Sequence, residues 1–252
     1  MGDTRIGAVL SSALTLATAC SGCGLPAGAR PPAFFLAGDS TTAVDGGWGN
    51  GLLAPLVRPA WGVNIGQSGA TTASFIGGGN WSNVVTHLKG YAGKYDCYVT
   101  ISFGHNDQKP ENNVTFDVYQ QNLIDFANEV KNLGGTPLLV SSLTRRVFPR
   151  DPHNATDSLH NERLAAIEAA NVTDATLIDL NAASLVYVDT IGRDASWAYN
   201  WGPGDMTHLN PYGEVVFGRM VIDLIIHAKP SLESWFIPNE TLSYALLHGL
   251  PA

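Results

Sequence analysis

The sequence predicts an α/β fold of three layers, α/β/α, in which helices cover both faces of a parallel five-stranded sheet. Short apolar segments alternate along the chain with longer amphipathic ones, which is the pattern of parallel strands joined by helices. The composition agrees, because 45% of the 252 residues are hydrophobic and 27 Gly and 14 Pro supply many turns. We expect a single domain at residues 30–252.

Five short apolar runs are typical of strands buried between two helical layers. In this chain order they predict a sheet of flavodoxin-like type. The expected strands are Ala33–Gly38, Val63–Gly66, Cys97–Phe103, Thr136–Ser141 and Leu177–Asp179.

Longer amphipathic segments between and after these runs predict the helices. Asn210-Pro211 is a helix start signal, and Lys131 to Gly135 indicates a helix end followed by a strand. The expected helices are Leu52–Arg58, Trp81–Tyr91, Tyr119–Leu133, His160–Asn171, Asn181–Ile191 and Tyr212–His227.

Residues 142–158 show no clear period and predict a long loop after the fourth strand. Long loops in α/β domains often carry function. Ligands of open parallel sheets bind outside the carboxyl ends of the strands, so we expect the chemistry at that edge.

The charge balance limits the partners. Asp and Glu number 22 against 14 Lys and Arg, which gives a formal net charge of −8. An acidic surface argues against nucleic acid and anionic membranes as partners. We expect a monomer that meets only its substrate.

Residues 1–29 read as a secretory signal peptide. The run Ile6–Ala19 follows Arg5 and is apolar, and Ala17-Thr18-Ala19 and Ala27-Gly28-Ala29 both fit a cleavage site. The run is shorter than the roughly 20 residues of a membrane span. A frayed N-terminal extension is the alternative, but we expect a secreted, extracellular protein.

Cleavage near Arg30 would remove Cys20 and Cys23 and leave Cys97 as a buried apolar side chain. The sequence then implies neither a disulfide framework nor a zinc site. Five Asn-x-Ser/Thr sequons would suit a glycoprotein. They lie at Asn80, Asn113, Asn154, Asn171 and Asn239.

Polar turns follow the first three predicted strands and precede the last helix. Ser40 follows the first strand, Gly69 lies in the turn after the second, and Asn106 follows the third. Asp205 stands three residues before His208, a spacing that lets a carboxylate hold an imidazole by its ring N–H. Alone, a hydroxyl after a strand is more often a helix cap, so Ser40 is a candidate nucleophile only in combination with the other residues.

Acyl transfer needs a nucleophile, a base, a group that orients the base, and donors for the oxyanion. Ser40 would supply the nucleophile, His208 the base and Asp205 the orienting carboxylate. The backbone N–H groups of Ser40 and Gly69 and the Asn106 amide would form the oxyanion hole. Such a site needs no metal and no cofactor.

These residues resemble the four sequence blocks of the SGNH (GDSL) hydrolases. Gly38-Asp39-Ser40, Gly69, Gly104-x-Asn106-Asp107 and Asp205-x-x-His208 occur in their order and approximate spacing. The chain is most similar to the rhamnogalacturonan acetylesterases of carbohydrate esterase family twelve, through His105 in block three and through residues 141–146 and 178–181. Their fungal members can carry disulfides, which one remaining Cys cannot form.

The resemblance implies a serine esterase that removes acetyl groups from the pectin backbone, an acidic polysaccharide, outside the cell. An SGNH esterase or lipase for other short acyl esters, such as acetylated xylan, is the nearest alternative. A flavin mononucleotide protein and a catalytically silent glycan-binding module are weaker ones, because neither needs a complete nucleophile, base and orienter.

Two residues compete with the assigned set. Ser68 stands in Gly66-Gln67-Ser68-Gly69-Ala70, which nearly matches a nucleophile elbow but ends in Ala. His105 has no carboxylate at a fixed spacing before it, and we expect it to be a hydrogen-bonded structural histidine.

Cations and aromatic side chains near these turns are candidate substrate contacts. Arg145 and Arg146 could bind galacturonate carboxylates, and Trp197 and Trp201, with Tyr199 between them, could stack on sugar rings. Exposed loop charges and core aromatics are the alternatives.

Overall fold

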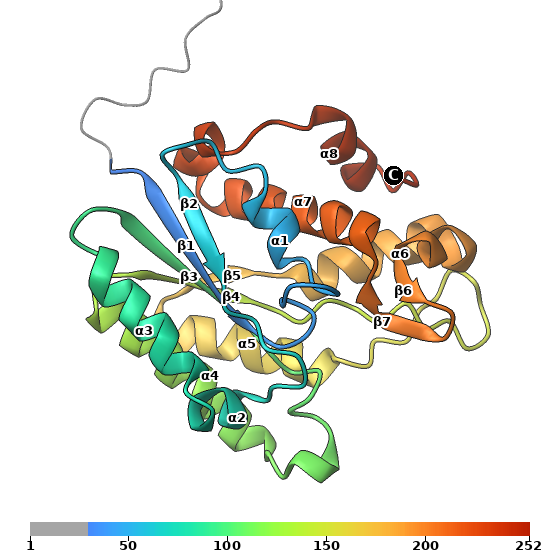
Figure 1. Ribbon diagram of the computed structural model, residues 1–252. Coiled ribbons are helices and arrows are strands. Elements are labelled where there is room, and N and C mark those ends of the chain that lie inside the picture. Colours follow the sequence, from blue (N-terminus) through green and yellow to red (C-terminus); the bar gives the residue numbers. More distant parts are fainter. Residues whose placement is uncertain (1–29) are drawn as a thin grey trace, which may run out of the picture.

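The computed structural model describes residues 30–252, which form a parallel five-stranded sheet between two layers of helices (Figure 1). The strands lie in the order β2-β1-β3-β4-β5, and all neighbours are parallel. The predicted three-layer fold is confirmed, and the signal peptide expected at residues 1–29 lies outside the described residues. The strands are β1 Pro32–Gly38, β2 Trp61–Asn64, β3 Asp96–Ser102, β4 Thr136–Val140 and β5 Thr176–Ile178.

Alternate side chains of the central strand β1 enter two separate cores. Phe34 and Leu36 belong to one core, and Ala33, Phe35 and Ala37 belong to the other. Successive side chains of a strand point to opposite faces of the sheet. Because helices cover both faces, every position of β1 is buried, and the strand reads as an uninterrupted apolar run.

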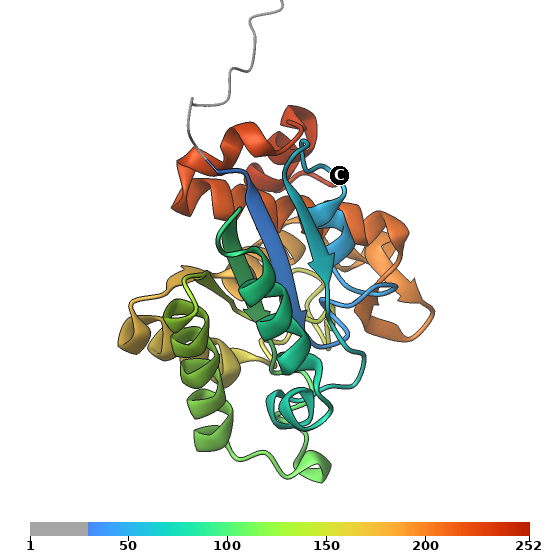
Figure 2. The same ribbon diagram turned by 60° about the vertical axis from the view of Figure 1, so that its left-hand side comes forward.

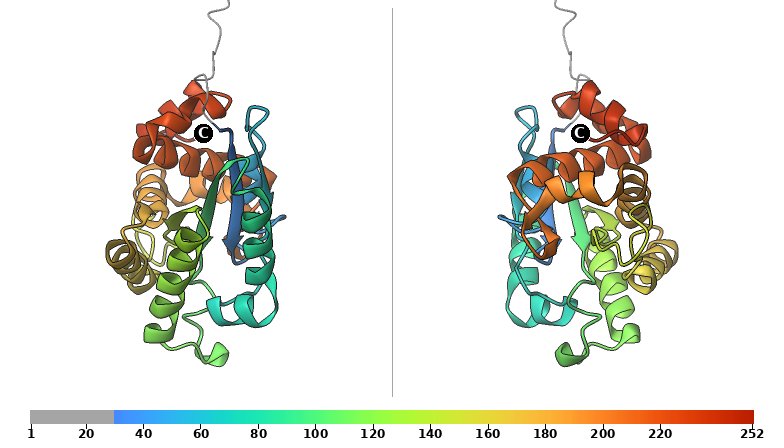
Figure 3. Two further views of the ribbon diagram at one scale, coloured as in Figure 1. Left: turned by 90° about the vertical axis from the view of Figure 1, so that its left-hand side faces the viewer. Right: turned by 90° about the vertical axis from the view of Figure 1, so that its right-hand side faces the viewer.

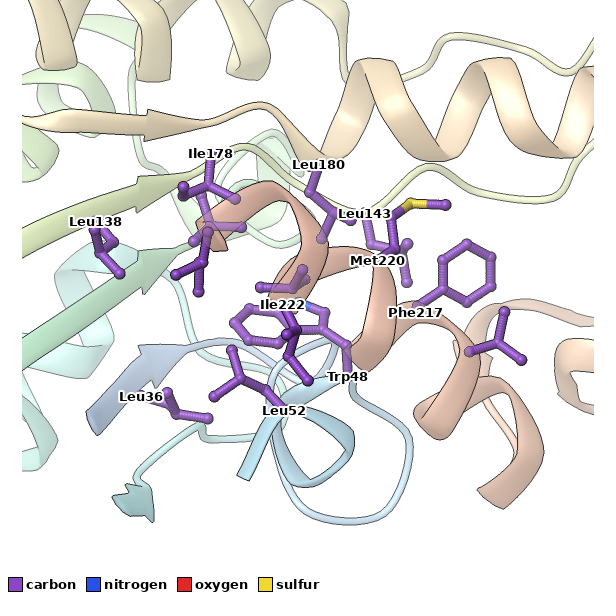
Figure 4. Close-up of a cluster of buried hydrophobic side chains, with 14 of the residues drawn as sticks. Leu36, Trp48, Leu52, Leu138, Leu143, Ile178, Leu180, Phe217, Met220 and Ile222 are labelled. Atoms are coloured by element: carbon purple, nitrogen blue, oxygen red, sulfur yellow. The ribbon is translucent and has the colours of Figure 1, made fainter. Parts of the chain in front are cut away.

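The helices divide between the two faces (Figures 2 and 3). α1, α6 and α7 cover one face, with α8 packed against α7, and α2, α3, α4 and α5 cover the other. Figure 4 shows the core next to α7, where Ile222 lies beside Trp48 in the centre of the cluster. The helices are α1 Gly49–Leu53, α2 Thr72–Gly77, α3 Asn80–Tyr91, α4 Phe116–Asn132, α5 His160–Thr173, α6 Leu180–Ser196, α7 Pro211–Ala228 and α8 Glu240–Leu247, and the 3-10 helices are η1 Pro110–Asn112, η2 Trp197–Tyr199 and η3 Pro230–Trp235.

Most predicted elements are found within a few residues, but the helix predicted at Leu52–Arg58 is wrong. The helix in this region, α1, ends at Leu53. Pro55 and Pro59 follow, and a proline lacks the N–H of a helix interior and disfavours helical backbone in the residue before it. The helices α2 and α8 and the three 3-10 helices are also absent from the sequence prediction.

A hairpin that the sequence analysis did not predict lies directly before α7. Its strands are β6 (Asn200–Gly202) and β7 (Asp205–Leu209), which pair in the antiparallel sense. The side chain of Asn210 accepts a hydrogen bond from the Gly213 N–H at 2.8 Å and caps α7, as the predicted helix start requires. The hairpin therefore presents His208 on a strand that a helix start fixes at one end.

The loops after β1 to β4 leave the sheet at one edge. The chain passes from β1 to β2 on one side and then to β3 on the other, so the strand order reverses between β1 and β3. Open α/β sheets bind ligands at such a point. The long loop predicted at residues 142–158 follows β4 at this edge.

Residues 30–252 contain neither a membrane-spanning helix nor a cluster of metal-ligating side chains. No helix there has the length and apolar character to cross a membrane. No group of three or more His, Cys, Asp or Glu side chains there is placed to hold a metal ion.

Candidate active site

The turn after β1 places Ser40 at the edge of the sheet. The buried Asp39 carboxylate accepts hydrogen bonds at 2.8 Å from the backbone N–H and the hydroxyl of Thr41. A Cβ added to Gly38 would lie 2.3 Å from the Thr42 hydroxyl oxygen, so only glycine lets the turn fold back this closely. Ser40 keeps 8% of its surface exposed.

The hairpin brings His208 to Ser40 across 168 residues of sequence. Nε2 of His208 lies 2.8 Å from Oγ of Ser40. On its other side, Nδ1 of His208 lies 2.8 Å from Oδ2 of Asp205. The structure thus brings together the three residues that the sequence analysis proposed as nucleophile, base and orienting carboxylate.

The environment of Asp205 determines which ring nitrogen of His208 carries the proton. Burial alone would raise the pKa of Asp205, but hydrogen bonds from the backbone and ring of His208 and from the Thr207 N–H hold it below its ordinary value. An ionised carboxylate can only accept, so Nδ1 carries the proton. In the neutral imidazole Nε2 is then the acceptor, and the Ser40 hydroxyl donates a hydrogen bond to it.

Three hydrogen-bond donors belong to residues that line one cavity beside Oγ of Ser40, and they are available to the oxyanion of an acyl intermediate. The backbone N–H groups of Ser40 and Gly69 donate to no other group among residues 30–252. Gly69 has φ +77°, and a Cβ there would meet nothing within 4 Å, so its backbone is open to a ligand. The amide of Asn106 donates to the Ala70 carbonyl at 3.0 Å through one of its two Nδ2 hydrogens, which leaves the other free.

These groups surround a cavity of about 340 Å³. No side chain in its lining is a large apolar one, and two are cationic. The lining residues are Ser40, Ser68, Gly69, His105, Asn106, Lys109, Arg145, Thr207 and His208.

The two competing residues do not form a second nucleophile and base. His105 is buried, and its Nε2 lies 2.8 Å from the Leu143 carbonyl oxygen. Burial lowers the pKa of His105 to about 3, so the ring is neutral and donates to that carbonyl. His105 is the hydrogen-bonded structural histidine that we expected, and Ser68 is exposed with no histidine hydrogen-bonded to its hydroxyl in the described chain.

Arg146 is a correction to the predicted substrate contacts, because its side chain is 1% exposed and cannot reach a polysaccharide. Its guanidinium donates to Oδ1 of Asn200 in β6 and, at 2.7 Å, to the carbonyl oxygen of His208 in β7. It also lies 5.8 Å from the ring centre of Phe217. Arg146 therefore ties both strands of the hairpin to the loop after β4.

Replacing Arg146 by methionine is expected to lower both kcat and the free energy of unfolding. The change leaves the Asn200 and His208 oxygens without their buried donor, and hydrogen bonds to charged groups contribute about 1.5–3 kcal/mol each. Urea denaturation and steady-state kinetics measure the two effects. The control is Arg150→Met, at an exposed arginine of the same loop. An Arg146→Met variant with the same kcat and free energy of unfolding as this control would contradict the role of Arg146 in holding the hairpin.

Asp39 makes the stability depend on pH. Burial raises the pKa of the Asp39 carboxyl to about 6, and the nearby Asp107 carboxylate adds to the rise. A folded-state pKa above the unfolded value favours the folded protein at low pH, and this contribution is lost as the pH rises from about 4 through about 6.

Asp39→Asn is expected to reduce the fall in unfolding free energy between pH 4 and pH 7. Asn cannot ionise, so the buried charge that the wild type acquires in this interval is absent. Denaturation at several pH values measures both slopes. Asp45→Asn, at an exposed position of the loop before α1, is the control, and parallel curves for wild type and Asp39→Asn speak against the effect.

Tyr199 is 1% exposed and belongs to the core, so its predicted place among the sugar contacts is wrong. The other predicted contacts lie in two places. Arg145 lines the cavity, and its guanidinium donates to the Ser158 hydroxyl at 2.8 Å. Trp197 and Trp201 are 60% and 51% exposed and belong to the segment that leads into and forms the hairpin. Trp197 lines a second cavity of about 360 Å³ at the hairpin tip.

Lys109 also lines the cavity beside Ser40, and the sequence analysis missed it. Its position three residues after Asn106, directly before Pro110, was the available signal. In a tight turn this spacing brings two side chains to one side of the chain.

Comparison with known proteins identifies related sequences. The model of the GDSL-like Lipase/Acylhydrolase family matches residues 36–215. The chain is 30% identical over 236 residues to the rhamnogalacturonan acetylesterase RhgT of Bacillus subtilis strain 168, covering 84% of this chain and 97% of that protein.

Solved structures share the fold. The Bacillus subtilis protein YXIM_BACsu superposes with a TM-score of 0.68 at 20% identity, over 79% of this chain and 57% of that one. The acetylxylan esterase Axe2 of Geobacillus stearothermophilus superposes with a TM-score of 0.57 at 21% identity, over 78% of this chain and 95% of that one. The resemblance on which the sequence analysis relied is confirmed.

Proposed function

The chain belongs to the GDSL-like lipase/acylhydrolase family and is a carboxylic ester hydrolase, and from this premise we propose that it removes O-acetyl groups from a pectic polysaccharide outside the cell. The single observation that carries the chemistry is the continuous contact from Asp205 through His208 to Ser40, at 2.8 Å on each side of the imidazole.

The proposed reaction has two steps. Oγ of Ser40 attacks the acetyl carbonyl carbon while Nε2 of His208 takes the hydroxyl proton, and the oxyanion meets the N–H groups of Ser40, Gly69 and Asn106. The C–O bond to the sugar then breaks, and His208 returns its proton to the leaving sugar oxygen. In the second step His208 takes a proton from water, which attacks the carbonyl carbon of the acetyl-enzyme. The bond to Oγ of Ser40 then breaks, His208 returns the proton to Oγ, and acetate leaves.

The lining of the cavity favours a substrate with a short acyl group. This lining has no large apolar side chain against which a long acyl chain could be buried away from water. An acetyl group needs only the space beside Ser40. The same feature argues against a lipase with a long acyl substrate.

Two cations in the cavity lining favour an acidic polymer as the substrate. Lys109 and Arg145 line the cavity, and no carboxylate does, although the whole chain has a net charge of −8. This distribution attracts an anionic substrate to the site. The name of the relative RhgT points to the same polymer class.

The exposed tryptophans supply a place for neighbouring sugars. Trp197 and Trp201 lie on the segment that also carries Asp205 and His208. A polysaccharide bound at Ser40 and extending along the hairpin would meet their aromatic faces, on which sugar rings stack. This contact is part of the proposal.

Secretion follows from the proposed substrate. A pectic polymer is found outside cells, and the predicted signal peptide at residues 1–29 would deliver the enzyme there. Acetylated xylan is the second candidate substrate, since the solved structure of Axe2 is that of an acetylxylan esterase.

Acetate release tests the substrate. Wild-type protein is incubated with acetylated rhamnogalacturonan and acetylated xylan side by side, with Ser40→Ala as the blank. We expect release from the pectic polymer that the variant lacks. Release from xylan alone, or only from a small aryl acetate, would exclude the pectic substrate and keep the serine chemistry.

A further inference from the structure

We propose that Lys109 is a positioning residue of the oxyanion hole, whose ammonium group orients and polarises the Asn106 amide. The inference rests on the proposed function, because it needs Asn106 to donate to the oxyanion. It assigns a purpose to a charged side chain in the cavity that neither the sequence motifs nor the proton-transfer chain uses.

Contacts at both ends fix the orientation of the Asn106 amide. Nζ of Lys109 donates to Oδ1 of Asn106 at 2.8 Å, and Nδ2 of Asn106 donates to the Ala70 carbonyl at 3.0 Å. An ammonium group only donates and a carbonyl only accepts, so both contacts require the same orientation of the amide. The side chain is 5% exposed, and one Nδ2 hydrogen remains for a ligand.

The local backbone holds Lys109 in reach of Asn106. The Lys109 N–H donates to the Asn106 carbonyl at 3.1 Å, which closes a tight turn. Lys109 has an extended conformation, φ −78° and ψ 123°, which the following Pro110 favours. Asn112 then donates through Nδ2 to the Asn106 carbonyl at 2.8 Å, so the segment after Lys109 is tied back to the same residue.

The charge of Lys109 is directed at this amide. No carboxylate of residues 30–252 forms a salt bridge with Lys109, and its one side-chain hydrogen bond goes to Asn106. A cation on the amide oxygen draws electron density from the amide nitrogen and makes its remaining N–H a stronger donor.

The effect of Lys109 on the Asn106 amide stabilises the transition state and not the bound substrate. The negative charge that the Asn106 N–H meets develops only as Ser40 attacks, so the contribution of Lys109 appears in kcat and not in KM. If Lys109 instead bound a substrate carboxylate, its loss would raise KM for an anionic polymer and leave a neutral ester unaffected. A neutral substrate therefore separates the two roles.

The experiment is a double-mutant cycle on 4-nitrophenyl acetate, a neutral ester. The variants are Lys109→Met, Asn106→Ala and the pair together. Lys109→Arg tests rescue by a retained charge, and Lys94→Met, an exposed lysine of the turn before β3, is the matched control. Lys109 is exposed, so its substitution leaves the core intact.

We expect Asn106→Ala to lower kcat by about 10²- to 10³-fold, as for the loss of an oxyanion donor. Lys109→Met should lower kcat by about tenfold, a fraction of that donor's effect, with KM unchanged. In the double variant, Lys109→Met should lower kcat no further than Asn106→Ala does alone, because the amide through which Lys109 acts is gone. Lys109→Arg should recover part of the loss, and Lys94→Met should equal the wild type.

Two results overturn the inference. One is a Lys109→Met variant with wild-type kcat on the neutral ester, whatever happens to KM on the polymer. The other is a Lys109→Met substitution that lowers kcat by the same factor in the wild type and in Asn106→Ala. Ser40→Ala, measured alongside, reports on the proposed function separately, since its inactivity stands whatever Lys109 does.

Discussion

Ser40→Ala is expected to lower kcat for acetate ester hydrolysis by about 10⁶-fold, the order of loss found when a serine nucleophile is removed. The reason is chemical: without Oγ there is no atom to form the acyl-enzyme, although the oxyanion donors and the cavity remain. The substitution removes one atom at the edge of the sheet, so the melting temperature should not change. Initial rates and thermal unfolding measure the two quantities.

Ser68→Ala is the matched control for this prediction. Ser68 lines the same cavity, but no histidine accepts its hydroxyl proton in the described structure. This variant should retain most of the activity. Full activity of Ser40→Ala together with an inactive Ser68→Ala would identify Ser68, in the turn after β2, as the nucleophile.

Asp205→Asn is expected to lower kcat by about 10⁴-fold while the protein stays folded. The Asp205 carboxylate accepts the Nδ1 proton of His208 and thereby keeps Nε2 as the acceptor that faces Ser40. An amide NH₂ at the same place would turn toward Nδ1 and favour the other tautomer, in which Nε2 carries the proton. Single-turnover rates of acetyl-enzyme formation measure this loss directly.

Asp194→Asn is the control for this prediction, because Asp194 is an exposed aspartate at the end of α6. If Asp205→Asn retains more than about a tenth of wild-type kcat, Asp205 does not orient the base. A folded protein by circular dichroism is required in either case, since Asp205 also accepts the backbone N–H groups of Thr207 and His208.

The sheet could be predicted because its strands are buried on both faces. In β1 both sets of alternate side chains enter a core, so the sequence shows an apolar run that no exposed position interrupts. The hairpin β6–β7 lacks this signal, since its strands have three and five residues and Leu209 is their one buried position. Its pairing depends on contacts with the loop after β4, which lies far away in sequence.

Much of the candidate site could be predicted because parallel strands end at one edge. Ser40 and Asn106 follow neighbouring strands, and the Asp205 to His208 spacing is local. The direction of Arg146 could not be predicted, because two adjacent arginines in an irregular loop give no sign of which points inward. Arg145 lines the cavity, whereas Arg146 is buried against Phe217 and hydrogen-bonded to the hairpin.

Covalent trapping tests the central claim most directly. The protein is treated with a fluorophosphonate, which phosphonylates an activated serine, and the labelled peptide is identified by mass spectrometry. We predict one phosphonyl group per chain, on Ser40, with no labelling of Ser40→Ala and much slower labelling of His208→Ala. A label on Ser68 or on another serine, with Ser40 unmodified, would contradict the assignment of Ser40 as the nucleophile.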